Sequence, residues 1–328
     1  MKKPDPIEQA LDRLGALRSE GAAPDAVALE LRKFLGHRSN LVVAKAAKIA
    51  GELHSGKSMP DLVTAFERLM ADPQKLDKGC AAVTEIIGAL FDLDCIEPEI
   101  YLRGIHHVQM EGSFGPPVDA ASKLRAFSAL GLVRTRYPHA MEEAVDLLVD
   151  REPEARIGAV RALASNGGDA GALLLRLKVL NGDSEPDVIA ECFSGLLASA
   201  SERSLSFVAE YADSEDAAIA EAAILALGMS RRPAAFDLLK RIWERSAHGL
   251  LRKTLLLAMA LTRAEAAVEF LVALLESGTV QTAKDTITAL ALYRDNERIR
   301  QLIEAAVSRR GEKQLIEAFG RELAVSER

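Results

Sequence analysis

With 328 residues, 49% of them hydrophobic and only 5% aromatic, the chain has enough length for two ordinary domains or one extended array of repeats. Its many Ala and Leu residues favour helices, whereas all-β folds carry more aromatic and β-branched residues. A formal net charge of −7 weighs against a dedicated nucleic-acid binder. Three cysteines, an odd and sparse set, argue against a disulfide framework and fit a reducing compartment.

The chain lacks the sequence features of secreted and membrane proteins. Its first residues lead into an amphipathic stretch with charges throughout, not into the apolar core of a signal peptide. The longest apolar run, Leu255 to Leu261, is far too short to span a bilayer. We therefore expect a cytoplasmic protein with no membrane partner.

Helices are predicted along the whole chain, and prolines mark many of their starts, where the first turn tolerates proline. In chain order the predicted helices are 6–19, 24–36, 40–54, 59–72, 76–91, 97–109, 118–136, 139–150, 153–165, 169–181, 185–199, 201–213, 215–229, 232–246, 248–261, 263–277, 279–293, 296–309 and 312–324. The fold class predicted from this pattern is all-α.

One phrase recurs along these helices: a small residue, two variable residues, then Ala-Leu-Gly or a close variant. Its Leu-equivalent positions are Ala50, Ile87, Leu130, Leu163, Leu196, Leu227, Met259 and Leu290. The last five intervals are 33, 33, 31, 32 and 31 residues, after two longer ones of 37 and 43. Small residues let neighbouring helices pack closely while the Leu fills the gap between layers, so each helix pair must stack on the next.

The phrase resembles the second helix of HEAT repeats, especially the short repeats named after phycobilisome lyases. That family's fuller pattern places a Val-Arg pair before the small residues, which here reads Ala155-Arg156 and Leu251-Arg252, with Lys123 at a third equivalent position. Other copies lack the basic residue. The resemblance covers roughly residues 24–324 and implies an α-solenoid, or superhelix, of about nine stacked antiparallel helix pairs whose second helices line a concave surface.

We predict a single domain over 1–328, because no Gly/Ser-rich linker divides the chain. It comprises an N-terminal cap region at 6–36, repeats at 37–293 and a C-terminal cap at 296–324. Helices 6–19 and 312–324 carry charge on more of their surface than the inner helices, as end caps of a repeat array do.

The interval of 43 residues contains the least repeat-like stretch, 104–119. It concentrates four polar side chains beside a Gly/Pro-rich turn: His106, His107, Gln109 and Glu111. Insertions in a solenoid commonly form loops on one face, and such loops often bind partners.

Two other interpretations of this stretch stay open. If the preceding helix continued, His107 and Glu111 would share one face, and His106 or Asp119 could complete a metal site. The favoured interpretation is structural: the loop offsets one helix pair and caps helix 118–136 with Asp119 or nearby groups. We predict no bound metal and no cofactor.

Residues 51–58 match the pattern G-x-x-x-x-G-K-[ST] of phosphate loops. A real phosphate loop joins a buried strand to a helix. Here Gly51 ends the predicted helix 40–54, while Ser58 and Pro60 fit the cap and first turn of the next helix. The helical context therefore argues against a nucleotide site.

Charge is distributed unevenly. Residues 142–221 hold 17 acidic and 6 basic side chains, whereas residues 231–263 hold 8 basic and 2 acidic ones. The basic stretch contains Trp243, the only tryptophan. Either these are ordinary solvated faces and Trp243 fills the space between layers, or the stretch forms a positive patch in which an exposed Trp is a binding hot spot. Lys123, Arg156 and Arg252 either bond to the adjacent repeat or face a ligand in the concave groove.

The leading hypothesis is a non-catalytic scaffold or adaptor that binds a protein partner through its concave face and through the 104–119 loop. The candidate binding residues are Lys123, Arg156, Arg252, His106, His107, Gln109, Glu111 and Trp243, with no catalytic residue predicted. The alternative is a HEAT-like enzyme resembling either DNA-alkylation glycosylases or chromophore lyases. The acidic composition and single Trp weigh against the first, and no catalytic residue matches the second.

Overall fold

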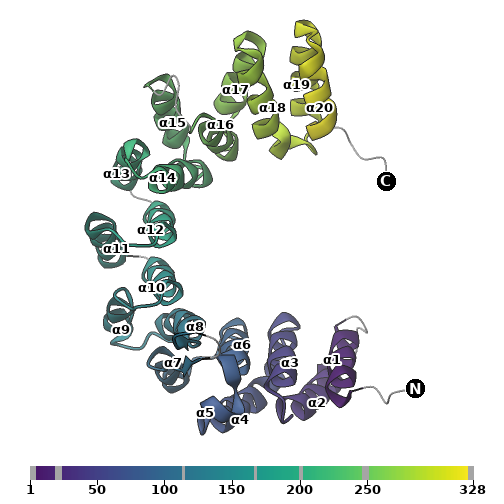
Figure 1. The fold of residues 1–328 in the computed structure, drawn as a ribbon, viewed down its shortest axis with the longest axis vertical. Helices are drawn as coiled ribbons and strands as arrows, with labels where there is room; N and C mark the ends of the chain where they lie inside the picture. The colour runs from purple at the N-terminus through teal and green to yellow at the C-terminus, as the bar shows by residue number, and fades with distance from the viewer. Residues whose placement is uncertain are drawn as a thin grey trace. The chain divides into compact units, whose positions relative to one another are not determined.

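The structure, a computed structural model, describes residues 5–18, 24–112, 115–165, 168–198, 202–245 and 251–323. Within these residues the chain is helical almost throughout and contains one small two-stranded sheet (Figure 1). The predicted all-α array of stacked helix pairs is confirmed. No described helix is both long enough and apolar enough to cross a membrane.

The chain forms two compact units, residues 1–174 and 175–328. The single continuous domain inferred from the sequence stays a prediction. Helix α11 (Asp169–Asn181) contains the boundary between the units.

Unit 1 consists of helix pairs in two layers. The first-helix layer contains α2 (Pro24–Leu35), α4 (Met59–Met70), α7 (Pro98–Ile105) and α9 (Ala140–Leu147). The second-helix layer contains α3 (Asn40–Glu52), α6 (Ala81–Asp92), α8 (Ser122–Arg134) and α10 (Pro153–Ser165), packed in series after α1 (Pro6–Leu17). Short elements join them: η1 (Gly56–Ser58), α5 (Pro73–Leu76), η2 (Lys78–Cys80), β1 (Met110–Glu111) and β2 (Val118–Asp119).

Unit 2 repeats this arrangement. Its first-helix layer contains α13 (Glu202–Glu210), α15 (Pro233–Arg245), α17 (Glu265–Ser277) and α19 (Glu297–Arg310). Its second-helix layer contains α12 (Pro186–Ala198), α14 (Ala217–Met229), α16 (Arg252–Leu261), α18 (Val280–Leu290) and α20 (Lys313–Leu323), again packed in series. The turns η3 (Tyr211–Asp213) and η4 (Ala291–Tyr293) follow α13 and α18.

Small residues allow the second helices to approach closely. A Cβ atom added to Gly158 in α10 would lie 2.3 Å from the Cα of Ala126 in α8. One added to Gly228 in α14 would lie 2.4 Å from the carbonyl oxygen of Ala258 in α16. Both distances are far shorter than a carbon atom tolerates, so these contacts require glycine.

The predicted core register is confirmed at seven of its eight positions. Ala50, Ile87, Leu163, Leu196, Leu227, Met259 and Leu290 are each at most 2% exposed. Leu130 is the exception and is only partly buried. It lies in α8, which borders the irregular insertion.

Three predicted helix boundaries around the insertion are wrong. The helix predicted at 118–136 starts only at Ser122, because Val118 and Asp119 lie in strand β2. The helix predicted at 76–91 starts only at Ala81, because Gly79 and Cys80 adopt left-handed φ angles of 73° and 49° and turn the chain. The helix predicted at 97–109 ends at Ile105. His107 and Glu111 therefore do not share a helical face, and Glu111 lies in a strand instead.

Residues 51–58 begin in the last turn of a helix and not after a strand, as the sequence context indicates. Gly51 lies in α3, where an added Cβ would be 3.2 Å from the Cα of Ala89. The Ser58 and Ser55 hydroxyls share a hydrogen bond of 2.8 Å, and Lys57 forms an ion pair with Asp25. The segment serves as the turn between α3 and α4.

The register predicts a severe effect for Leu196→Asp. Leu196 is 2% exposed, so the substitution buries a carboxylate between layers and is expected to lower the free energy of unfolding by about 3 kcal/mol or more. Urea denaturation followed by circular dichroism measures this change. Ser194→Asp, at an exposed position of the same helix, is the matched control and should change stability by less than about 0.5 kcal/mol. Equal stabilities for the two variants would contradict the register.

Candidate functional site

The 104–119 insertion ends in a β-hairpin with two different sides. Met110 pairs with Asp119 and Glu111 pairs with Val118. Successive side chains of a strand point to opposite sides. Here the polar residues Gln109 and Asp119 are buried, whereas the apolar residues Val108, Met110 and Val118 are 59%, 50% and 63% exposed.

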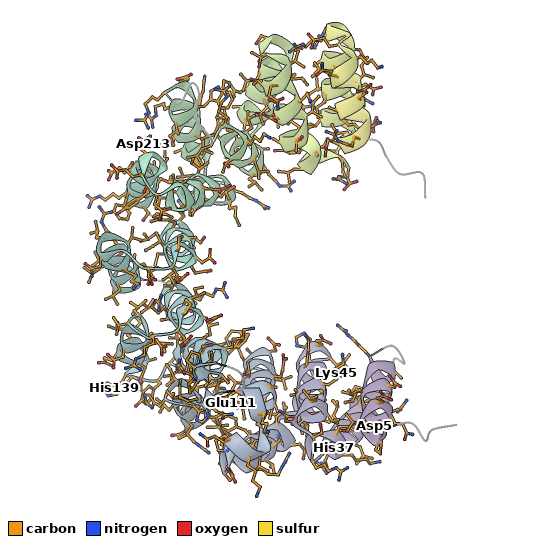
Figure 2. The ribbon with its side chains drawn as sticks, viewed as in Figure 1. Asp5, His37, Lys45, Glu111, His139 and Asp213 are labelled. Carbon is orange, nitrogen blue, oxygen red and sulfur yellow. The ribbon has the colours of Figure 1, made fainter. Side chains whose placement is uncertain are left out.

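The buried side of the hairpin is bonded to the turn before α6. The side-chain amide nitrogen of Gln109 donates one hydrogen bond to the carbonyl oxygen of Asp77 at 3.0 Å and another to the carboxylate of Glu111 at 2.5 Å. The side-chain amide oxygen of Gln109 lies 3.1 Å from Nε2 of His107. Glu111, labelled in Figure 2, accepts a hydrogen bond from the backbone N–H of Gly79 at 2.8 Å. The side chains of Gln109 and Glu111 therefore form hydrogen bonds inside unit 1.

Asp77 organises the same turn from inside. It is fully buried and accepts hydrogen bonds from the backbone N–H groups of Ala82 at 3.0 Å and Val83 at 2.8 Å, in the first turn of α6. The side-chain amide of Asn40, at the start of α3, also donates to it at 2.9 Å. One carboxylate therefore satisfies the first N–H groups of α6 and links them to the neighbouring second helix.

Arg125 joins the hairpin to the turn between α9 and α10. It is 3% exposed and forms a bidentate ion pair with Asp150, with both hydrogen bonds 2.9 Å long. It also donates to the carboxylate of Asp119 at 2.7 Å and to the carbonyl oxygen of His107 at 2.9 Å. Charge-assisted bidentate bonds of this kind are the strong ones in proteins.

The ionisation of these groups reflects the network. Burial alone would raise the pKa of Asp119, but hydrogen bonds from the backbone N–H groups of Ala121 and Gln109 and from Arg125 lower it below its usual value. Burial likewise opposes the charge on Arg125, but its bonds to Asp150 and Asp119 raise the pKa of Arg125. Both groups are therefore held in their charged forms, as a buried ion pair requires.

Cys80 shows the opposite effect. Burial, reinforced by the carboxylates of Asp77, Glu111 and Asp119, raises the pKa of its thiol to about 12. At neutral pH the thiol is protonated and is a poor nucleophile.

The structure brings three of the four predicted loop residues together, where their hydrogen bonds attach the loop to the rest of unit 1. His107, Gln109 and Glu111 bond to one another or to adjacent backbone, while His106 lies apart, 2.6 Å from Glu143 of α9. Among the described residues, no group of three or more His, Cys, Asp or Glu side chains is placed to hold a metal ion.

The three basic repeat positions have different surroundings. Arg156 is 7% exposed and donates to the carbonyl oxygens of Asp150 at 2.9 Å and Arg151 at 3.1 Å, which lie in the turn directly before its own helix and not in the adjacent repeat. Arg252 lies over the ring of Trp243, 3.8 Å from its centre. Lys123 is exposed on α8.

Trp243 is 8% exposed and therefore fills the space between layers. The basic stretch around it is also largely engaged: Arg245 pairs with Asp213 (labelled in Figure 2), Lys253 pairs with Asp285, and Arg232 donates to the carbonyl oxygen of Leu197. Lys240 and Arg263 lie over the rings of Phe270 and Tyr293. These contacts favour a structural role for the stretch.

Sequence reasoning missed Arg125, Phe127 and the exposed side of the hairpin. Phe127 is 40% exposed one turn after Lys123 on α8. The partners of Arg125 are up to 25 residues away, so no local pattern reveals them. The hairpin did leave a trace, because polar and apolar residues alternate from Val108 to Glu111 with the period of a strand.

Comparisons with known proteins identify the repeats. Residues 173–260 match the family model of HEAT repeats, which confirms the recognition of this repeat type. An engineered protein of known structure is 16% identical, with 98% of this chain and 96% of that chain covered and a TM-score of 0.40. Human deoxyhypusine hydroxylase, solved in complex with glycerol, is 17% identical over 79% of this chain and 92% of its own, with a TM-score of 0.31. A search of curated proteins found no match.

The network predicts that Arg125→Met strongly destabilises unit 1. The substitution leaves the carboxylates of Asp119 and Asp150 without their buried partner, which should cost about 3–5 kcal/mol of unfolding free energy. Lys123→Met removes an exposed cation two residues away in the same helix and is expected to change stability by less than about 0.5 kcal/mol. Urea denaturation of both variants measures the contrast. A loss below about 1 kcal/mol for Arg125→Met would show that the network contributes little.

A pH dependence follows from Asp119. Because its pKa is lower in the folded chain than in the unfolded one, it contributes stability above its unfolded pKa of about 3.9, and this contribution is lost as the pH falls through the folded value. Stability measured between about pH 7 and pH 2 should therefore fall more steeply for the wild type than for Asp119→Asn. Parallel curves would contradict the charged state assigned to Asp119.

Proposed function

We propose that this chain, which carries HEAT repeats, is a non-catalytic scaffold that binds a protein partner through two surfaces of unit 1. The first surface is the exposed side of the hairpin, made by Val108, Met110 and Val118 together with Pro116 and Pro117. The second is the open face of α8, made by Lys123 and Phe127.

The observation that carries the proposal is the hairpin. Its apolar side chains remain exposed although its polar side is bonded into the interior through Gln109 and Asp119. An apolar surface held on a rigid base loses little conformational entropy when a partner covers it. Exposed apolar patches on soluble chains commonly mark interaction sites.

The open face of α8 supports the same conclusion. This helix packs against α6, α7, α9 and α10, and the side that carries Lys123 and Phe127 is exposed. Lys123 and Phe127 are both exposed on α8 and lie one turn apart. Aromatic side chains are enriched at the centres of protein interfaces, and the adjacent Lys123 favours a partner with an acidic residue at this point.

Internal bonding favours a scaffold over an enzyme. His106 and His107 each have a side-chain partner, Glu143 and Gln109. Burial raises the pKa of the Cys192 thiol to about 12, as it does for Cys80, so neither thiol is ionised at neutral pH. These groups are engaged in packing and internal bonding.

Quantitative affinity capture tests the proposal, with the purified chain as bait and mass spectrometry as readout. One variant, Met110→Ser/Val118→Ser, alters the hairpin, and a second, Lys123→Glu/Phe127→Ser, alters the open face of α8. Each is expected to lower recovery of the same partner protein by about tenfold or more, as loss of an interface centre does.

The matched control is Lys75→Glu/Val149→Ser, which makes the same kinds of change at exposed positions elsewhere in unit 1. It should retain the partner, and all variants should melt like the wild type. Equal recovery with every variant, or recovery of nucleic acid or pigment in place of a protein, would contradict the proposal.

A further inference from the structure

We propose a second binding site, in unit 2: the cleft between α17 and α19 binds a cationic amphipathic peptide segment of a partner protein. This site shares no residue with the two surfaces of unit 1 and carries the opposite charge. Its test is therefore independent of the scaffold function proposed above.

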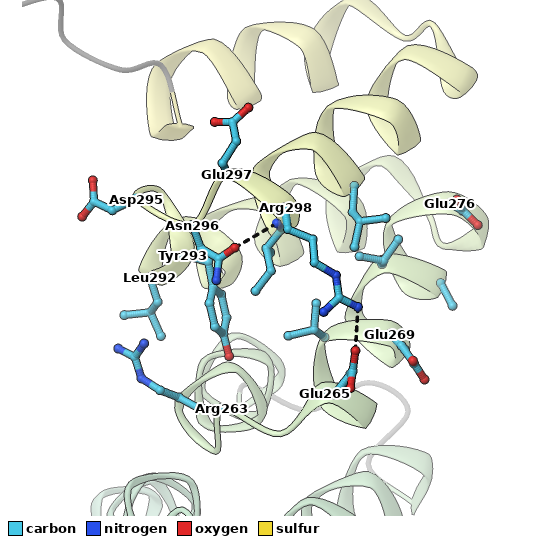
Figure 3. A pocket seen from close by; sticks show the side chains of 15 residues that line it. Arg263, Glu265, Glu269, Glu276, Leu292, Tyr293, Asp295, Asn296, Glu297 and Arg298 are labelled. Atoms are coloured by element: carbon cyan, nitrogen blue, oxygen red, sulfur yellow. Dashed lines mark hydrogen bonds and ion pairs between the residues drawn. The ribbon is translucent and has the colours of Figure 1, made fainter.

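The cleft has a volume of about 1120 Å³ and lies on the first-helix layer (Figure 3). Single small-molecule sites typically occupy about 300–1000 Å³, so this space accommodates several side chains of a peptide. Its walls come from α17, α19 and the turns that precede them.

The cleft has an apolar lining. Val268 and Val272 line it from α17, and Ile299 and Leu302 line it from α19. Leu302 is 42% exposed, so part of this lining faces solvent. Covering it with apolar side chains of a ligand would remove that surface from water.

Two interactions of lining residues hold the walls of the cleft in place. The Tyr293 hydroxyl donates a hydrogen bond of 2.6 Å to the carbonyl oxygen of Ala260, and its ring is 6% exposed. The guanidinium of Arg298 on α19 pairs with Glu265 on α17 at 2.6 Å and so bridges the two walls (Figure 3). The cleft is therefore built on side chains with internal partners.

The charge around the cleft is negative. Its lining contains two guanidiniums and five carboxylates, those of Glu265, Glu269, Glu276, Asp295 and Glu297. When Arg300 and Arg309, which pair with two of these carboxylates from outside the lining, are included, the formal balance is −1. Three of them already pair with arginines: Glu265 with Arg298, Glu276 with Arg309, and Glu297 with Arg300.

Two carboxylates remain available to a ligand. Glu269 and Asp295 are exposed, and within the described part of the chain neither side chain forms a hydrogen bond or a close ion pair. Glu269 also lies near enough to Arg298 to contribute to the raised pKa of that guanidinium. They come from opposite walls, Glu269 from α17 and Asp295 from the turn before α19, as Figure 3 shows. A segment lying in the cleft would meet a carboxylate on either side of an apolar floor.

This combination selects one ligand chemistry. An acidic segment would be repelled by the carboxylates, and a purely polar cation would leave the apolar lining uncovered. A peptide with Leu-like side chains on one face and Lys or Arg on the flanks matches both features. Helix-in-groove recognition uses this arrangement of anchors.

Fluorescence anisotropy tests the site with the full chain and three labelled peptides of about twelve residues. The first has Leu on one helical face and Lys on the other, the second replaces Lys with Glu, and the third replaces Leu with Ser. Saturable binding is expected for the Leu/Lys peptide and at least about tenfold weaker binding for the other two, because each lacks one half of the match.

Variants then locate the binding. The double variant Glu269→Lys/Asp295→Lys should weaken the affinity for the Leu/Lys peptide by about tenfold. Leu302→Ser should weaken the same affinity by about fivefold, because apolar contact is lost. The single variant Glu269→Lys has Glu304→Lys as its matched control, since both change the charge by the same amount and Glu304 is exposed on α19 without lining the cleft. Glu304→Lys should leave binding unchanged.

Three results would overturn the proposal: equal binding by the wild type and the double variant, equal weakening by Glu269→Lys and Glu304→Lys, or equal binding of the Ser/Lys peptide. The second would show a response to net charge alone, and the third would show that the apolar lining contributes nothing. All substituted positions are exposed, and thermal melting checks that each variant folds.

Discussion

The close approach of neighbouring second helices is the constraint on which each unit depends. Gly158 lies against Ala126, and Gly228 lies against Ala258, at distances that no larger side chain permits. Helices that meet through small residues leave no room between them for polar side chains, so the apolar core continues from one repeat to the next. Most buried polar side chains then lie in turns or next to the insertion, although a few, such as Thr286 in α18, are buried within the second helices.

The insertion before α8 is where this regular packing is interrupted, and a polar network replaces it. Arg125, Asp119 and Asp150 form a buried charged cluster that connects the hairpin with the turn between α9 and α10. Such a cluster contributes to a defined structure only when every member is bonded, as it is here. Its consequence for function is indirect: because the polar side of the hairpin is used internally, the side left to a partner is apolar.

Sequence periodicity was sufficient for the repeats and insufficient for the insertion. The spacing of the Leu-equivalent positions predicts their burial correctly at Leu163, Leu196 and Leu227, because helix packing repeats the same local pattern. The polar loop residues were recognised as unusual, but the sequence does not show that their side chains point into the interior. The side chain of Gln109 points inward because it donates a hydrogen bond to the carbonyl oxygen of Asp77, about 30 residues earlier in the chain. The cleft between α17 and α19 also arises from tertiary packing, so no motif marks it.

Hydrogen exchange of the free chain tests most directly whether the polar side of the hairpin is part of the folded framework. The amides to compare are those of Gly79, Gln109 and Ala121, each of which donates to a carboxylate of the network. The account predicts that they exchange about as slowly as amides in the middle of α8. Exchange at the rate of an unprotected loop would show that the network does not hold the hairpin, and the polar residues would then be available to a partner after all.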